Sequence, residues 1–150
     1  MDVFAEFETI AAAFADRKIP YAVIGGVALA FHAQPRFTKD VDLLVAAAHF
    51  SGATETLKSC GYFPSAGPWT FPKVRLTLHR FLKPAENDEF FVDVLVAEAP
   101  ELEAIVGRAK VVVSPGHPPI PVAVRNDLIA LKKLRASPQD QADIARLQDE

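Results

Sequence analysis

The sequence contains a single cysteine, Cys60, in 150 residues. One thiol forms neither an internal disulfide framework nor a cysteine-based zinc cluster, and this scarcity fits a reducing compartment. No apolar run approaches the about 18 residues that a membrane-spanning helix requires, and the amino terminus lacks the basic start of a signal peptide. We therefore expect a cytoplasmic protein with no membrane span.

Positive charge is also scarce. Sixteen Lys and Arg residues stand against nineteen Asp and Glu residues, which gives a formal net charge of −3 at pH 7. No global positive field attracts nucleic acid, so any contact with nucleic acid must be local. Apolar residues make up 50% of the chain and charged residues 23%, a balance typical of a compact globular protein. This length favours one domain over residues 1–150.

Apolar residues recur at helical spacing in several segments, and proline or glycine marks their ends. The predicted helices cover residues 3–18, 27–33, 47–59 and 100–109, and a helical pair closes the chain from Asn126 and from Ser137-Pro138 onward. Alternating or wholly apolar segments predict strands. The predicted strands cover residues 21–24, 40–45, 73–82, 90–97 and 110–114.

Proline and glycine mark the predicted turns and loops. Residues 84–89 have the composition of a turn, so the strands on either side of it should form a hairpin. Residues 62–69 hold two prolines and one glycine and are predicted as loop, and residues 115–121 hold four prolines and are predicted as a rigid connector. Together these elements predict an α/β (α+β) fold: a small mixed sheet flanked by helices, with a C-terminal helical pair.

Two aspartates on one predicted strand are the first candidate site. Asp40 and Asp42 face the same side of the strand, and their Cα atoms should be about 7 Å apart. Two carboxylates that project together repel each other unless a cation lies between them, and hard oxygen ligands of this kind suit Mg²⁺. The alternative is a solvated strand end with two surface aspartates.

A third acid lies in apolar surroundings. Asp93 stands within residues 90–96, where every neighbour indicates burial and an unpaired ionised group is very costly. Asp93 must therefore have a partner. Either an arginine or backbone amides neutralise it, or it is the third ligand of the Asp40 and Asp42 site on an adjacent strand.

Two glycines stand directly between a predicted strand and a predicted helix. Without side chains, Gly25 and Gly26 would let backbone amides approach a phosphate at the start of the helix. The alternative is a simple tight turn. The spacing matches neither a dinucleotide-binding fingerprint nor a phosphate-binding P-loop.

The order of these features resembles the polymerase-beta-like nucleotidyltransferase superfamily: Gly25-Gly26, then Arg36-x-Thr38-x-Asp40-x-Asp42, then Asp93 on a later apolar strand. The end of the chain is similar to the small bacterial branch related to abortive-infection toxins. That similarity rests on residues 126–132, followed by Arg135, Ser137-Pro138, Asp140 and Asp143.

The resemblance implies transfer of a nucleoside monophosphate from an NTP to a hydroxyl acceptor, with release of pyrophosphate. It implies that Asp40 and Asp42 bridge two Mg²⁺ ions. Asp93 would bind the catalytic ion and either lower the pKa of the acceptor hydroxyl or take its proton. Gly25 and Gly26 would hold the phosphates.

Three further residues are candidates for nucleotide binding. Lys132 would hold its charge near the triphosphate, or its stem would cover the core. Thr38 lies two residues before Asp40. If the strand already begins at Thr38, the two side chains face the same side of it. Arg36 is either a phosphate clamp or the partner of an acid. The histidines (His32, His49, His79 and His117) show no metal-ligand spacing, and we assign them no metal.

The acceptor stays open at this stage: tRNA, a protein, or a small molecule such as an aminoglycoside or a lincosamide. The chain carries little beyond a nucleotidyltransferase core, so a second copy of the chain or a cognate partner protein would help to recognise the acceptor. The rival interpretation is a non-catalytic module, antitoxin-like or regulatory, that keeps the fold and binds a partner without turnover.

Overall fold

The computed structural model describes residues 3–25, 40–71, 74–86 and 88–135, together with residues 142, 144 and 145. Its elements follow in the order α1 (Val3–Asp16), β1 (Ala22–Ile24), β2 (Asp40–Ala46), the 3₁₀ turn η1 (Ala47–His49), α3 (Phe50–Ser59), β3 (Phe63–Phe71), β4 (Leu76–Ala85), β5 (Asp88–Ala97), α4 (Pro100–Arg108), β6 (Lys110–Val112), β7 (Ile120–Val122) and α5 (Arg125–Arg135). Of the described helices, none is long and apolar enough to cross a membrane.

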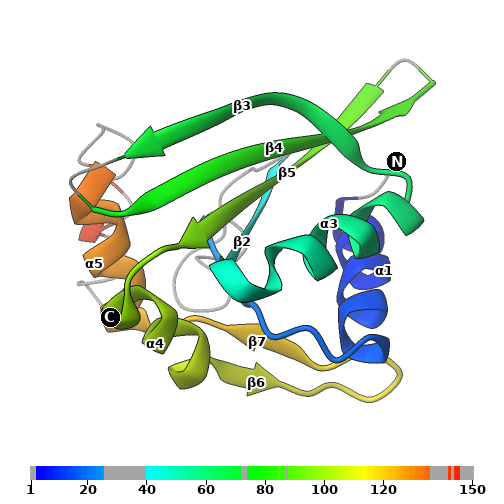
Figure 1. Ribbon diagram of the computed structural model, residues 1–150. Helices are drawn as coiled ribbons and strands as arrows, with labels where there is room; N and C mark the ends of the chain where they lie inside the picture. Colours follow the sequence, from blue (N-terminus) through cyan, green and yellow to red (C-terminus); the bar gives the residue numbers. More distant parts are fainter. Residues whose placement is uncertain are drawn as a thin grey trace.

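The strands form one seven-stranded mixed sheet in the order β3-β4-β5-β2-β1-β7-β6. β2 runs parallel to β5, and β1 runs parallel to β7, whereas the other neighbouring strands are antiparallel. Helices α1, α3 and α4 lie on one side of this sheet (Figure 1). The structure therefore confirms the predicted fold class, a mixed sheet flanked by helices.

Alternation along β2 separates a buried face of the sheet from a face that carries acids. Val41, Leu43 and Val45 are at most 2% exposed and belong to the hydrophobic core, whereas Asp40 and Asp42, which alternate with them, are partly exposed. This is the two-residue period of a strand with one face packed against helices. The sheet thus presents Asp40 and Asp42 on the side opposite its main core.

The prediction that residues 62–69 form a loop is wrong, because β3 spans Phe63–Phe71. β3 is one of the two edge strands of the sheet and pairs only with β4, and its register shifts between Pro64 and Ala66 and again between Ala66 and Trp69. An edge strand needs hydrogen bonds on one side only, so it tolerates prolines that an inner strand excludes.

Two further boundaries differ from the prediction. The expected turn over 84–89 is shorter, since the β4–β5 ladder continues through the pairs Pro84–Glu89 and Ala85–Asp88. The expected connector over 115–121 overlaps strand β7, because Val122 pairs with Val23 of β1 and Ile120 pairs with Val112 of β6. The predicted helix over 27–33 and most of the predicted helix after Ser137-Pro138 lie outside the described residues.

Candidate functional site

The register of two parallel strands brings the predicted acids together on one face. Asp42 of β2 is the direct partner of Asp93 of β5, and Asp40 is the partner of Phe91. Paired residues on neighbouring strands project to the same face, and neighbouring strands lie about 4.8 Å apart. Asp40, Asp42 and Asp93 therefore share the sheet face opposite helices α1, α3 and α4, as the sequence predicts for a third acid on an adjacent strand.

An arginine that the sequence analysis did not select stands among these acids. Arg80 of β4 pairs with Asp93 across the ladder and donates two hydrogen bonds to it, from Nε to Oδ1 at 2.8 Å and from Nη2 to Oδ2 at 3.0 Å. Its Nη2 also lies 3.9 Å from Oδ2 of Asp40. The guanidinium carbon is 4.9 Å from the ring centre of Phe91. Arg80 thus bridges two of the three acids above an aromatic ring.

Burial makes the pairing of Arg80 with Asp93 necessary. Asp93 is 5% exposed, and an ionised carboxylate at that depth requires a positive partner. The hydrogen bonds to Asp93 raise the pKa of Arg80 above its ordinary value, and the charges of Asp93, Asp40 and Asp42 add to the effect. The structure thus contains the arginine partner that was one of the two alternatives for Asp93, and this arginine lies beside Asp40.

Gly25 ends β1 against the carboxylate of Asp42. Its φ of +74° is in the left-handed region that favours glycine. A Cβ at this position would lie 2.8 Å from Cγ of Asp42 and would overlap its Oδ2. Whatever its role toward a phosphate, Gly25 is required here because the Asp42 side chain occupies the space beside the backbone.

Lys132 reaches the same place from α5. It is 5% exposed and lines a small cavity of about 20 Å³ together with Gly25 and Asp42. Apolar side chains form the remaining wall: Ile24, Leu76, Leu95, Leu128 and Leu131. The structure therefore brings Lys132 beside Gly25 and Asp42, although these residues lie far apart in the sequence.

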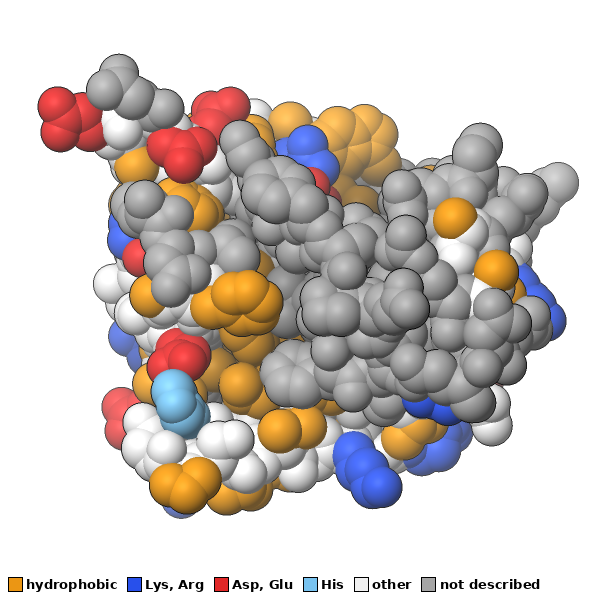
Figure 2. Space-filling model, turned by 180° about the vertical axis from the view of Figure 1, so that it is seen from behind, with side chains coloured by type: hydrophobic (Ala, Val, Ile, Leu, Met, Phe, Trp, Pro, Cys, Tyr) orange, Lys and Arg blue, Asp and Glu red, His pale blue; other side chains and the backbone are white. Residues whose placement is uncertain are grey.

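The remaining candidates, Gly26, Arg36 and Thr38, lie outside the described residues. Figure 2 shows the molecule from behind, turned by 180° from the view of Figure 1. A basic side chain lies there beside an acidic one, bordered by hydrophobic side chains. Opposite charges therefore lie next to each other on the described part of this face.

The donor set has the chemistry of a hard divalent cation site, because all three predicted ligands are carboxylates. Within the described ranges, however, no three His, Cys, Asp or Glu side chains are close enough together to hold a metal ion. Arg80 donates hydrogen bonds to both oxygens of Asp93.

No protein-family model and no curated protein sequence matches the chain. Solved structures do match its fold. The lincosamide antibiotic adenylyltransferase LnuA, solved with lincomycin, aligns with a TM-score of 0.59 and 16% identity over 96% of this chain and 95% of its own. ANT(2'')-Ia, solved in complex with adenylyl-2''-tobramycin, aligns with a TM-score of 0.59 and 17% identity over 94% of this chain and 84% of its own.

JHP933 from Helicobacter pylori aligns with a TM-score of 0.52 and 17% identity over 87% of this chain, which spans 54% of the length of JHP933. These comparisons show that the chain has a nucleotidyltransferase fold, and they confirm at the level of the fold the resemblance seen in the sequence. The similarity to the toxin-related branch stays a prediction.

Proposed function

We propose that this protein is a nucleotidyltransferase that moves a nucleoside monophosphate from an NTP to a hydroxyl acceptor. The observation that carries the proposal is the parallel register that sets Asp42 directly beside Asp93, with Asp40 on the same face. Sequence-distant acids on neighbouring strands, beside a glycine that ends a strand, are the arrangement that the resemblance leads us to expect. The nucleotidyltransferase fold supports the same conclusion.

In the proposed reaction the acceptor oxygen forms a bond to the α-phosphorus of the NTP. The bond from that phosphorus to the oxygen bridging the β-phosphate breaks, and pyrophosphate leaves. Asp40, Asp42 and Asp93 would hold two Mg²⁺ ions, which supply neutralisation of the triphosphate charge and lower the pKa of the acceptor hydroxyl. The proton of the acceptor hydroxyl passes to the Asp93 carboxylate.

The other candidate residues bind the nucleotide in this proposal. Lys132 places its ammonium group near the triphosphate from the cavity that it shares with Asp42. The backbone at Gly25 and Gly26 holds phosphate oxygens through its amides. Arg36 and Thr38, which precede β2 in the sequence, add phosphate contacts.

The acceptor that the comparisons favour is a small hydroxyl compound of the lincosamide or aminoglycoside kind. LnuA, whose length this chain matches almost completely, was solved with lincomycin, and ANT(2'')-Ia was solved with adenylyl-2''-tobramycin. The net charge of −3 argues against a large RNA acceptor. A tRNA or protein acceptor, as in a toxin–antitoxin pair, is the second class to test.

One observation favours a non-catalytic module instead. Arg80 already neutralises Asp93, so the acids have a positive partner within the chain itself. A protein that uses this fold only to bind a partner would need no metal ion at this site, because Arg80 of β4 already balances the charge of Asp93 of β5.

The test incubates the protein with each of four α-labelled NTPs and Mg²⁺, with lincomycin, tobramycin, tRNA or cell extract as acceptor. We expect label to enter one acceptor with the wild type and with Asp88→Asn, an exposed carboxylate at the start of β5. Asp42→Asn should reduce the rate by about 100-fold or more, because it removes a carboxylate that would hold the Mg²⁺ ions against the triphosphate. Equal labelling by wild type and Asp42→Asn would remove the proposed site, and no labelling of any acceptor would favour the binding module.

A further inference from the structure

We infer that Arg80 is a positioning residue that makes cation binding at Asp93 depend on the nucleotide. In the structure its guanidinium donates hydrogen bonds to both oxygens of Asp93, the carboxylate that a cation would need. When a triphosphate enters, Arg80 transfers to the phosphate oxygens and leaves Asp93 to the cation. The inference deepens the proposed function and rests on it.

The hydrogen bonds of Asp93 are the first step of the argument. Both carboxylate oxygens accept hydrogen bonds from Arg80, at 2.8 and 3.0 Å, and this forked geometry is the strongest form of pairing between these two side chains. Nη2 of the same guanidinium lies 3.9 Å from Asp40. A divalent cation bound to Asp93 would lie against the positive guanidinium, so the two compete for one carboxylate.

Burial is the second step. Asp93 is 5% exposed, so removal of Arg80 without replacement leaves a buried carboxylate unpaired. The protein therefore keeps Arg80 at Asp93 until another positive charge arrives. This predicts weak affinity of the wild type for a divalent cation when no phosphate ligand is present.

The surroundings of Arg80 are the third step of the argument. They leave room for its guanidinium group to move away from Asp93. Its side chain is 33% exposed, and the guanidinium lies over the ring of Phe91 rather than inside the core. Arginine binds phosphate oxygens with the same planar fork that it uses for carboxylates. A triphosphate held beside Asp42 would therefore offer Arg80 a new partner on the same face of the sheet.

Mn²⁺ titration followed by electron paramagnetic resonance tests the inference without any transfer reaction. The proteins are wild type, Arg80→Gln, Arg80→Lys and the matched control Arg108→Gln. Arg108 makes the same kind of fork to Asp127, at 3.0 and 2.9 Å, and Arg108 and Asp127 lie on α4 and α5. We expect Arg80→Gln to bind Mn²⁺ alone at least about ten-fold more tightly than wild type and Arg108→Gln, because it no longer competes for Asp93.

A second arm uses inorganic triphosphate, which carries no base. It should tighten Mn²⁺ binding by wild type and Arg108→Gln, and it should give a smaller gain with Arg80→Gln. Equal affinity of wild type and Arg80→Gln for Mn²⁺ alone would overturn the inference, as would the absence of Mn²⁺ binding in both. Near-ultraviolet circular dichroism checks folding. If Arg80→Gln does not fold, Arg80→Lys decides the question, since it keeps the charge but loses the fork and should bind Mn²⁺ more tightly than wild type.

These outcomes separate the inference from the proposed function. Tighter Mn²⁺ binding by Arg80→Gln, in a protein that labels no acceptor, would keep the role of Arg80 and reject the transfer reaction. Equal Mn²⁺ affinity, in a protein that labels an acceptor, would do the reverse.

Discussion

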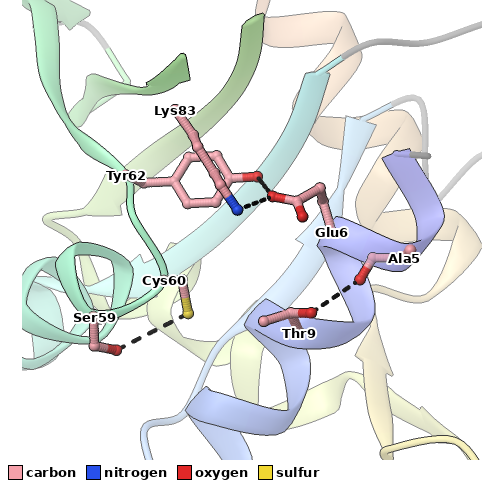
Figure 3. Close-up of polar contacts among 7 residues, drawn as sticks. All are labelled: Ala5, Glu6, Thr9, Ser59, Cys60, Tyr62 and Lys83. Atoms are coloured by element: carbon pink, nitrogen blue, oxygen red, sulfur yellow. Dashed lines mark hydrogen bonds and ion pairs between the residues drawn. The ribbon is translucent and has the colours of Figure 1, made fainter. Parts of the chain in front are cut away.

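Lys83 of β4 donates a 2.8 Å hydrogen bond to Glu6 of α1, 77 positions away in the chain (Figure 3). The same Oε1 atom accepts a 2.9 Å hydrogen bond from the hydroxyl of Tyr62. Burial and the neighbouring Glu6 raise the pKa of Tyr62 above its ordinary value, so the phenol stays protonated. One carboxylate oxygen therefore fastens the first helix to the segment before β3 and to β4.

Glu6→Ala should lower the free energy of unfolding by about 1–3 kcal/mol, because it leaves the polar groups of Tyr62 and Lys83 without their acceptor. Glu55→Ala is the control, since Glu55 is exposed and lies 3.8 Å from Lys58 on the surface of α3. That change should cost less than about 0.5 kcal/mol. Urea unfolding of both variants measures the difference, and equal midpoints would contradict the fastening role.

Gly25→Ala should destabilise the protein by about 1–3 kcal/mol, because it adds strain at a positive φ and displaces the Asp42 carboxylate. Gly107→Ala is the matched control within α4, where an added Cβ meets no atom within 4 Å. That variant should be more stable than wild type by up to about 1 kcal/mol. Thermal unfolding distinguishes the two, and a neutral Gly25→Ala would show that Asp42 can move away without loss.

Lys132→Gln should reduce kcat/KM for the NTP by about 10- to 100-fold in the labelling assay, the value of one charged hydrogen bond to phosphate. The neighbouring Lys133 is exposed on the same helix and provides the control. Lys133→Gln should keep the wild-type value. A Lys132→Gln protein with unchanged kcat/KM would assign the lysine to packing alone.

Burial lowers the pKa of His79 below its ordinary value of 6.5, and the charge of Glu98 opposes part of this effect. The unfolded chain therefore takes up a proton at a higher pH than the folded protein does. The stability that His79 contributes as a neutral ring is complete above pH 6.5 and is lost as the pH falls below it. Urea midpoints measured downward from pH 7 should fall less steeply for His79→Gln than for wild type; parallel profiles would contradict this.

Simple alternation was sufficient to predict the acid-bearing strands. The two-residue period of residues 40–45 places Asp40 and Asp42 on one face, and the apolar run around Asp93 marks a buried strand. The structure confirms both strands and their adjacency. What the acids bind stays a prediction, because alternation fixes the face of a side chain and not its ligand.

Arg80 was missed although the sequence contained a signal for it. Residues 84–89, predicted as the turn, are centred between positions 86 and 87. Antiparallel pairing outward from that centre sets position 80 opposite position 93, which is the observed register. Arg80 also interrupts the apolar side of its strand, between Leu78 and Leu82. A basic residue at such a position opposite a buried acid is the partner that Asp93 required.

Strand β3 was missed for a different reason. Its prolines and glycine have the composition of a loop, and only the position of the segment at the sheet edge lets them form a strand. The sequence pattern does not show which strand will lie at an edge of the sheet. The composition of this segment therefore led to the prediction of a loop. The contact between Gly25 and Asp42 was equally hidden, because it depends on how closely two antiparallel strands approach each other.

The edge strand β3 extends the face of the sheet that carries the acids. Phe63, Trp69 and Phe71 of β3 are 40–54% exposed and lie opposite Leu82, Leu78 and Leu76, so they continue the face of Asp93 outward. Neither β2 nor β5 pairs with β3 in the sheet. Changes to these aromatic side chains therefore leave intact the pairing of β2 with β5, which aligns Asp42 with Asp93.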